Sequence, residues 1–227
     1  FFVTFICVNV NADESEDKIH AANIWIDYGE LGKALKLLKE AQSYEYVSQS
    51  KINTSLGRIY FKLGKYEKSQ DLYESAIFST SSDDALGYLG LAQAYLESGN
   101  LTRAKMYAST LIEGKEKIVE ANSVLSEIDA RSGFREKADA RLKELSIKRP
   151  NDEQVVVAFS KFLFTYDKQV NAITKLQEFI STHPDAANAI EYLSRLKEFM
   201  GFKQESINIG FRAADIYEKR GEILRAK

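Results

Sequence analysis

Hydrophobic and small residues recur three and four positions apart along most of the chain, which is the spacing of amphipathic helices. The stretch from Ser50 to Asp83 shows the pattern most clearly, because one such run lies on each side of Gly64. Neither of these two helices could bury its apolar stripe alone, so the stretch requires neighbours of the same kind. The pattern predicts an all-helical chain built from helix-turn-helix units.

A turn position repeats along the chain at intervals of 34 or 35 residues, and glycine occupies it five times out of six. The six positions are Gly29, Gly64, Gly99, Gly133, Asp167 and Gly201. Alanine or serine stands five residues after each of them, where two helix backbones would approach closely. Both prolines of the chain, Pro150 and Pro184, lie 17 residues after a turn position, where a second helix should end. The spacing predicts repeats at 15–48, 50–83, 85–118, 119–152, 153–186 and 187–220.

This period, with an aromatic residue before the turn and a small residue after it, resembles that of the tetratricopeptide repeat (TPR) family. The match is strongest in the second and third repeats, which carry Leu56-Gly57, Tyr60, Gly64, Tyr66, Tyr73, Ala76, Leu91-Ala92, Tyr95, Gly99 and Ala104. It is weaker later, where Asp129 and Lys197 occupy the aromatic position and Gly210 stands where an aromatic residue is usual. The resemblance implies a right-handed α-α superhelix, a TPR solenoid of about six repeats over residues 13–227.

The chain begins with ten mostly apolar residues, FFVTFICVNV, followed by the polar run NADESED. The apolar run is too short to span a membrane. It is similar to the apolar region of a secretory signal peptide with cleavage after Ala12. We therefore expect residues 1–12 to be a signal peptide remnant and the protein to be periplasmic or extracellular. The alternative is a structural first segment in a cytoplasmic protein.

The first helix is expected to begin near Ser15, because Asp13, Glu14, Glu16 and Asp17 would place carboxylates in its first turn. Negative charge in that position stabilises a helix through its dipole.

Charge and motif content exclude several classes of function. The 227 residues carry a net charge of −2, which argues against nucleic-acid binding through bulk positive charge. The two histidines, His20 and His183, have no metal-ligand partner at a suitable spacing, and no phosphate-binding loop or dinucleotide fingerprint is present. We therefore expect no enzyme activity, no catalytic residues, no cofactor and no metal.

The resemblance also implies that the first helix of each repeat faces a concave groove. On this alignment the groove residues expected to contact a partner are Asn23, Ile26, Arg58, Phe61, Lys62, Leu89, Gln93, Leu96, Glu127, Arg131, Lys161, Phe164 and Arg195. Apolar residues mixed with charges of both signs suit an extended peptide or a partner helix.

The resulting hypothesis is a non-catalytic protein-protein interaction scaffold that binds a peptide or partner helix in this groove. By analogy of fold we place it in a cell-envelope assembly, such as polysaccharide export, pilus or outer-membrane machinery. Two alternatives stay open. One is the N-terminal TPR recognition arm of a larger enzyme, such as a glycosyltransferase, with a chain that continues beyond Lys227. The other is a cytosolic TPR adaptor.

Overall fold

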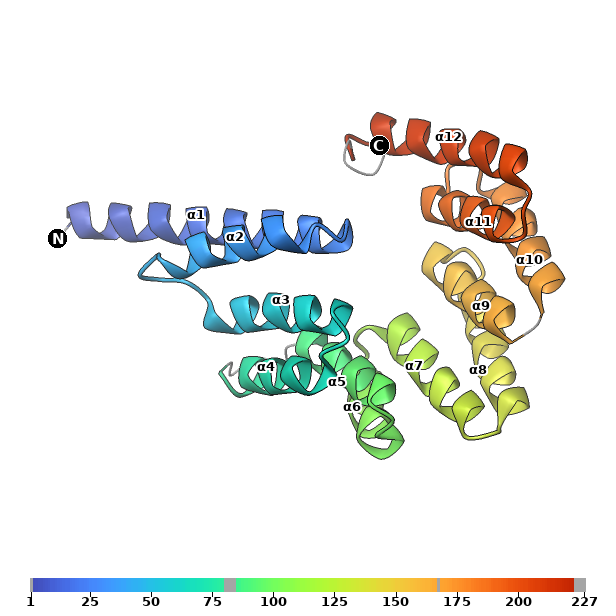
Figure 1. Cartoon of the computed structure of the whole chain (residues 1–227), viewed down its shortest axis with the longest axis horizontal. Coiled ribbons are helices and arrows are strands. Elements are labelled where there is room, and N and C mark those ends of the chain that lie inside the picture. The colour runs from blue at the N-terminus through green and yellow to red at the C-terminus, as the bar shows by residue number, and fades with distance from the viewer. Residues whose placement is uncertain (1, 80–84, 167, 223–227) are drawn as a thin grey trace. The chain divides into compact units, whose positions relative to one another are not determined.

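The computed structural model describes residues 2–79, 85–166 and 168–222, with side chains from residue 14 onward. Every regular element in this part of the chain is an α-helix (Figure 1). The helices are α1 (Phe2–Asp27), α2 (Leu31–Gln42), α3 (Gln49–Lys62), α4 (Tyr66–Phe78), α5 (Ala85–Glu97), α6 (Leu101–Glu113), α7 (Ile118–Arg131), α8 (Arg135–Lys148), α9 (Glu153–Thr165), α10 (Gln169–Thr182), α11 (Ala187–Phe199) and α12 (Lys203–Lys219). They form six helix-turn-helix pairs, as the repeat predicts.

The chain divides into two compact units, Phe1–Val124 and Leu125–Lys227, each with its own contacts. In the first unit α3 packs against α1, α2, α4 and α5. In the second, α11 packs against α9, α10 and α12. In both units the first helix of a pair therefore sits on the helix pair before it, as expected for a solenoid.

The turn glycines have the left-handed backbone that the pattern predicts. Gly29, Gly64, Gly99, Gly133 and Gly201 have φ between 69° and 89°, a region that side chains with a Cβ atom rarely enter. At Gly64, the glycine N–H donates to Phe61 O and the next N–H donates to Tyr60 O, both at 2.9 Å. This is the Schellman arrangement that satisfies the last carbonyls of a helix. Asp167, the sixth turn position, lies outside the described residues.

The first helix begins earlier than the sequence suggested. We expected a start near Ser15, but α1 extends back to Phe2. The reason is that no glycine or proline interrupts the chain before Gly29, so nothing ends the helix between the apolar and polar runs. The carboxylates at 13–17 therefore lie within the helix rather than in its first turn. The side chains of residues 1–13 are outside the described part, so the signal-peptide interpretation of 1–12 stays a prediction.

Small residues permit the close helix contacts in each pair. The residues five after the turn, including Ala34, Ala104 and Ala138, are fully buried. Where serine takes this position it also forms a hydrogen bond between the helices. Ser69 Oγ donates to Gly57 O at 2.9 Å, and in the last pair the direction reverses, because Ser194 Oγ donates to Ser206 O at 2.8 Å.

A second set of contacts closes five of the six turns between paired helices. It joins the residue four before the turn to the residue four after it, and we call these contacts clasp pairs. The clasp pairs are Trp25 with Lys33, Tyr60 with Lys68, Tyr95 with Arg103, Asp129 with Lys137, and Lys197 with Glu205. The first three are cation–π contacts, with 4.2–5.2 Å from the cation to the ring centroid. The last two are ion pairs at 2.8 and 2.7 Å. The residues that break the aromatic pattern, Asp129 and Lys197, thus keep the contact by other chemistry.

Asp129 is the most buried of these charges, with a side chain that is 12% exposed. Burial alone would raise the pKa of its carboxyl. Hydrogen bonds from Lys137 and Arg141 outweigh that effect and hold the pKa of Asp129 below its usual value. The carboxylate therefore stays ionised at neutral pH.

Tyr73 of α4 fills the space between two helices that carry glycine. A methyl group added at Gly57 of α3 would lie 2.9 Å from the Tyr73 ring, and one at Gly90 of α5 would lie only 2.2 Å from it. Both distances are shorter than carbon atoms tolerate. The aromatic ring and the two glycines therefore depend on one another.

We expect Gly90→Ala to destabilise the protein by about 1–3 kcal/mol, because the new methyl group must displace a packed ring. The gain in helix propensity, about 1 kcal/mol, is too small to offset this. Thermal or urea unfolding measures the change. The matched control is Gly32→Ala on α2, where an added Cβ meets no atom within 4 Å and stability should be unchanged or slightly higher. Equal effects of the two substitutions would show that Tyr73 does not require Gly90.

Candidate functional site

The surface expected to bind a partner is formed by the odd-numbered helices, and we call it the first-helix face. In the first unit it belongs to α1, α3 and α5. In the second unit it belongs to the end of α7 and to α9 and α11.

In the first unit, polar residues of this face link α1 to α3. Arg58 donates from Nη1 to Asn23 Oδ1 at 2.8 Å and from Nη2 to Asp27 Oδ1. Ser55 Oγ donates to the same Asn23 oxygen at 3.0 Å, and the Lys51 ammonium pairs with Glu16 at 2.7 Å. Asn23 and Arg58 were expected to contact a partner, and the structure shows that they bind one another. A ligand here would have to compete with an internal network.

Three of the apolar residues assigned to the groove belong to the core instead. Ile26 is 0% exposed, Leu96 is 5% exposed and Leu89 is 9% exposed. Ile26 packs with the buried residues of α1, α2 and α3. A residue at the edge of an apolar stripe becomes inaccessible once the next helix covers it. These three side chains are therefore removed from the candidate surface.

The other residues predicted in the first unit stay at or near the surface. Phe61 is half-buried against the Tyr66 ring, with 5.6 Å between ring centroids. Gln93 is half-buried and Lys62 is exposed. Their role in partner binding remains a prediction.

In the second unit, Glu127 and Arg131 are joined to the end of α9. Arg131 Nε donates to Glu127 Oε1 at 2.8 Å, and Tyr166 Oη donates to the same oxygen at 3.0 Å. The guanidinium of Arg135 lies 5.1 Å from the centre of the Tyr166 ring. Burial and the hydrogen bond to Glu127 raise the pKa of Tyr166 to about 12. Both predicted residues thus belong to an internal network here too.

Lys161 and Arg195 form a different environment on α9 and α11. The Lys161 ammonium lies 5.5 Å from the centre of the Tyr192 ring and has no hydrogen bond or ion pair within the described residues. Although the side chain as a whole is exposed, burial near the ring and the positive charge of Arg195 lower the pKa of Lys161. Glu191 opposes this shift, but it accepts hydrogen bonds from Arg195 and from Tyr217 Oη. The positive charge on Lys161 is therefore only partly compensated.

Aromatic side chains lie on the same two helices. The rings of Phe164 and Phe199 meet edge to face, with 5.2 Å between centroids and an angle of 81°. Phe164 is half-buried, whereas Phe199 is 79% exposed. The exposed Phe199 ring lies four residues after Arg195 on α11, and exposed aromatic surface is a common feature of binding surfaces.

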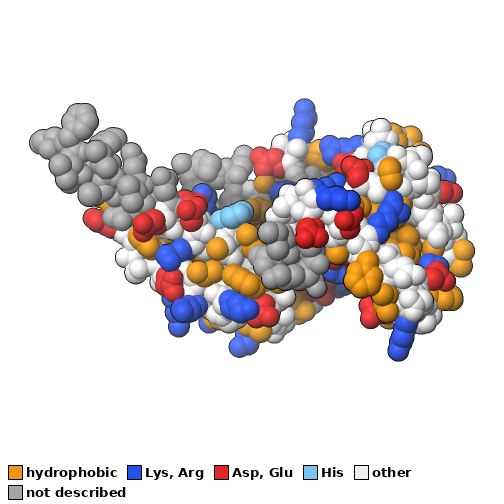
Figure 2. Space-filling view, turned by 90° about the horizontal axis from the view of Figure 1, so that it is seen from above, with side chains coloured by type: hydrophobic (Ala, Val, Ile, Leu, Met, Phe, Trp, Pro, Cys, Tyr) orange, Lys and Arg blue, Asp and Glu red, His pale blue; other side chains and the backbone are white. Residues whose placement is uncertain are grey.

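The surface carries charges of both signs. Figure 2 shows acidic and basic side chains interspersed with hydrophobic ones on the visible face of the described residues.

The described residues offer neither a metal site nor a membrane span. They contain no group of three or more metal-ligating side chains close enough together to hold an ion. In the same part of the chain, none of the helices combines the length and apolar character needed to cross a bilayer.

Similarity in fold connects the chain to known proteins. One match is TTC0263, a thermophilic TPR protein in Thermus thermophilus, with 19% sequence identity, coverage of 77% of this chain and 94% of that chain, and a TM-score of 0.52. Another is pilF of Pseudomonas aeruginosa, with 14% identity, coverage of 93% and 96%, and a TM-score of 0.55. The chain has the tetratricopeptide repeat fold.

A human IFIT1 dimer with PPP-AAAA is also similar, at 18% identity and a TM-score of 0.57, over 96% of this chain and 54% of that one. No family model matches the sequence, and no curated protein matches it either. These identities are low, so the comparisons establish the TPR fold and leave the partner to be inferred from the surface.

Two further residues shape this surface, Tyr166 and Tyr192, and the repeat pattern did not predict them. Both lie next to predicted residues in space, but neither occupies a groove position in the repeat. An alignment of neighbouring repeats could have identified them, because each tyrosine contacts a charged residue of the repeat before it. Burial, opposed by the charge of Arg195, raises the pKa of Tyr192 to about 12.

This shift predicts a loss of stability in alkali. Tyrosine in an unfolded chain loses its proton at about pH 10. The unfolded state is therefore favoured as pH rises from about 10 towards 12, and the effect is absent below pH 10. We expect Tyr192→Phe to be less sensitive than the native chain over this interval, by about 1–2 kcal/mol near pH 12. Urea unfolding from pH 8 to 12 provides the test, and parallel curves for the two proteins would contradict it.

Proposed function

We propose that this protein is a non-catalytic protein-protein interaction scaffold that binds a peptide or partner helix on the first-helix face of its second unit. The observation that carries the proposal is the position of the Lys161 ammonium, which lies 5.5 Å from the centre of the Tyr192 ring and has no hydrogen bond or ion pair within the described residues. The TPR fold supports it at a coarser level, because such solenoids present extended surfaces to other proteins.

The chemistry of the ligand follows from the side chains on α9 and α11. A carboxylate from a partner would relieve the repulsion between Lys161 and Arg195, and Arg195 offers the planar donors that carboxylates prefer. Phe199, with its exposed ring, offers an apolar contact for a neighbouring side chain. The preferred ligand is therefore a segment that carries an acidic residue beside an apolar or aromatic one.

The location in the cell is a further part of the proposal. The apolar run at residues 1–10 followed by a polar segment supports export. A place in a cell-envelope assembly rests on analogy of fold alone. The intact mass of the protein from its native host provides the test. We expect a mature chain that starts at Asp13, and retention of the apolar residues would instead favour the cytosolic adaptor.

Partner binding can be tested without a known partner by selecting peptides from a random library against the whole purified chain. We expect enrichment of peptides with Asp or Glu beside an apolar residue. The double substitution Lys161→Gln and Arg195→Gln should weaken their binding about tenfold or more, measured by titration calorimetry. A rise in the pKa of Lys161 on binding, followed by NMR, would provide independent evidence that a carboxylate has reached the ammonium.

The matched control is Lys143→Gln with Lys105→Gln, which removes the same charge from exposed positions on even-numbered helices. Equal loss of affinity in both variants would indicate attraction by net charge alone. Unchanged affinity in the Lys161 variant would exclude this face as the binding site.

A further inference from the structure

A hollow on the last helix pair occupies the place that an aromatic ring fills elsewhere in the chain. Tyr73 stands nine residues after its turn glycine, and its ring lies between α3 and α5. Gly210 stands nine residues after Gly201, on α12. A Cβ atom added at Gly210 would meet only Ser194 Oγ, at 3.2 Å. That contact is tight on the side of Ser194, but Gly210 carries no side chain of its own and lines a hollow, whereas the Tyr73 ring fills the equivalent position of the second repeat.

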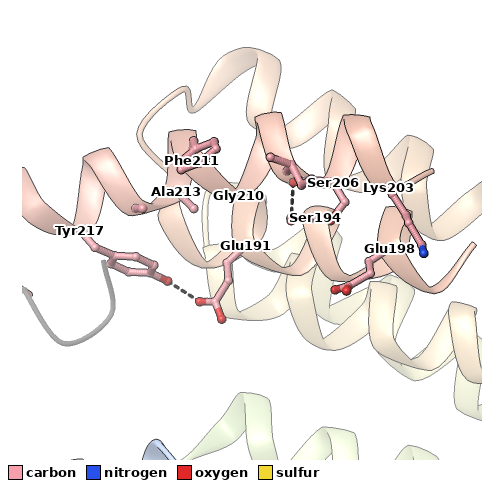
Figure 3. Close-up of a pocket in the computed structure, with 11 residues that line it drawn as sticks. Glu191, Ser194, Glu198, Lys203, Ser206, Gly210, Phe211, Ala213 and Tyr217 are labelled. Atoms are coloured by element: carbon pink, nitrogen blue, oxygen red, sulfur yellow. Dashed lines mark hydrogen bonds between the residues drawn. The ribbon is translucent and has the colours of Figure 1, made fainter. Parts of the chain in front are cut away.

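The hollow has a volume of about 570 Å³ and is lined by α11 and α12 (Figure 3). Ser194 and Ser206, which hydrogen-bond to one another, lie beside Gly210. At the rim, Phe211 is 72% exposed and Ile207 is 51% exposed. The volume exceeds that of one aromatic side chain, and the exposed rim offers apolar surface to whatever enters.

Acidic residues outnumber basic ones around this hollow. Glu191 and Glu198 contribute carboxylates from α11, and Lys203 contributes one cation from α12. Glu191 accepts hydrogen bonds from Tyr217 and Arg195, while Glu198 is exposed and has no ion-pair partner within the described residues. A cation on an incoming ligand would therefore find its complement at Glu198.

Packing elsewhere in the chain shows what kind of ligand fits. In the first unit, α5 packs on α3 and α4, and its Gly90 accepts the ring of Tyr73. In the first unit the ring belongs to α4 and the glycine to the next helix, α5. On α12 the glycine is Gly210, so the ring would have to come from the helix that packs on it. An incoming helix must then supply the aromatic ring itself.

We propose that the face of α11 and α12 binds an amphipathic helix of a partner protein, which inserts one aromatic side chain against Gly210 and places a lysine or arginine beside Glu198. This surface is separate from the Lys161 ammonium, so it adds a second partner contact to the scaffold. The two surfaces meet at Glu191, which faces both Arg195 and Tyr217. Binding at either one can be lost while the other remains.

The test uses the whole chain and a synthetic amphipathic peptide of about four helical turns, ~14 residues. The peptide carries one central Phe and a Lys one turn away. Versions with Ala for Phe, or with Glu for Lys, serve as ligand controls. We expect the Phe–Lys peptide to bind with a Kd of about 10–100 μM, measured by fluorescence anisotropy, and each control peptide to bind about tenfold more weakly.

Gly210→Leu is the informative protein variant. Leucine occupies the same repeat position at Leu38, Leu142 and Leu176, and at Gly210 its Cβ atom would lie 3.2 Å from Ser194 Oγ, so only a small shift of that side chain is needed. It adds apolar surface but fills the hollow, and we expect at least a tenfold loss of affinity for the Phe peptide. Non-specific adhesion would predict equal or tighter binding, and that result would overturn the proposal.

Two further variants locate the contact. Phe211→Ser should weaken binding severalfold, whereas Ile147→Ser, which removes a 70% exposed aliphatic side chain from α8, should leave affinity unchanged. Glu198→Lys should reverse the preference between the Lys and Glu peptides, and an unaltered preference would contradict the predicted charge contact. Self-association of the native chain that Gly210→Leu abolishes, without binding of the peptide, would assign the face to a second copy and overturn the proposal of a partner helix.

Discussion

Two helix backbones can pack closely only where the residues between them are small, and this constraint governs the whole chain. It explains why alanine or serine follows every turn position by five residues. Serine at this contact must also satisfy its hydroxyl. Ser69 and Ser194 do so through carbonyl groups of the facing helix, whereas the buried hydroxyls of Ser126 and Ser160 have no hydrogen-bond partner within the described residues. Every pair has a small residue at the helix contact, but not every buried serine hydroxyl there has a hydrogen-bond partner within the described residues.

The clasp pairs show that different residue types can make the same contact across a turn. An aromatic ring under a cation, an aspartate with a lysine, and a lysine with a glutamate all join the same two points across the turn. In Lys197–Glu205 even the sign of the charges is exchanged relative to Asp129–Lys137. Each of these contacts is individually weak, about 1 kcal/mol or less where it is exposed. Their repetition suggests that they orient the two helices of a pair rather than drive folding.

Much of the fold could be predicted from the sequence because it depends on residues that few others can replace. Glycine at Gly64 or Gly99 is required by a positive φ, and Ala104 is required by the distance between helices. The site was harder to predict. The exposure of Ile26, Leu89 and Leu96 depends on how far the following helix covers the edge of a stripe, which periodicity does not specify. The pairing of Asn23 with Arg58 depends on how far side chains reach between repeats. Gly210 replaces the aromatic residue that is usual at its repeat position, and only the structure shows the hollow that this glycine leaves.

Within each unit, contacts among the described helices join helices one or two positions apart along the chain. These helices therefore pack with little entropy cost from closing long loops. A repeat could accordingly be duplicated or deleted in a gene, and only one interface between neighbouring repeats would have to form anew. The length of the binding surface is then a quantity that evolution can adjust in steps of about one 34-residue unit, without redesigning the interior.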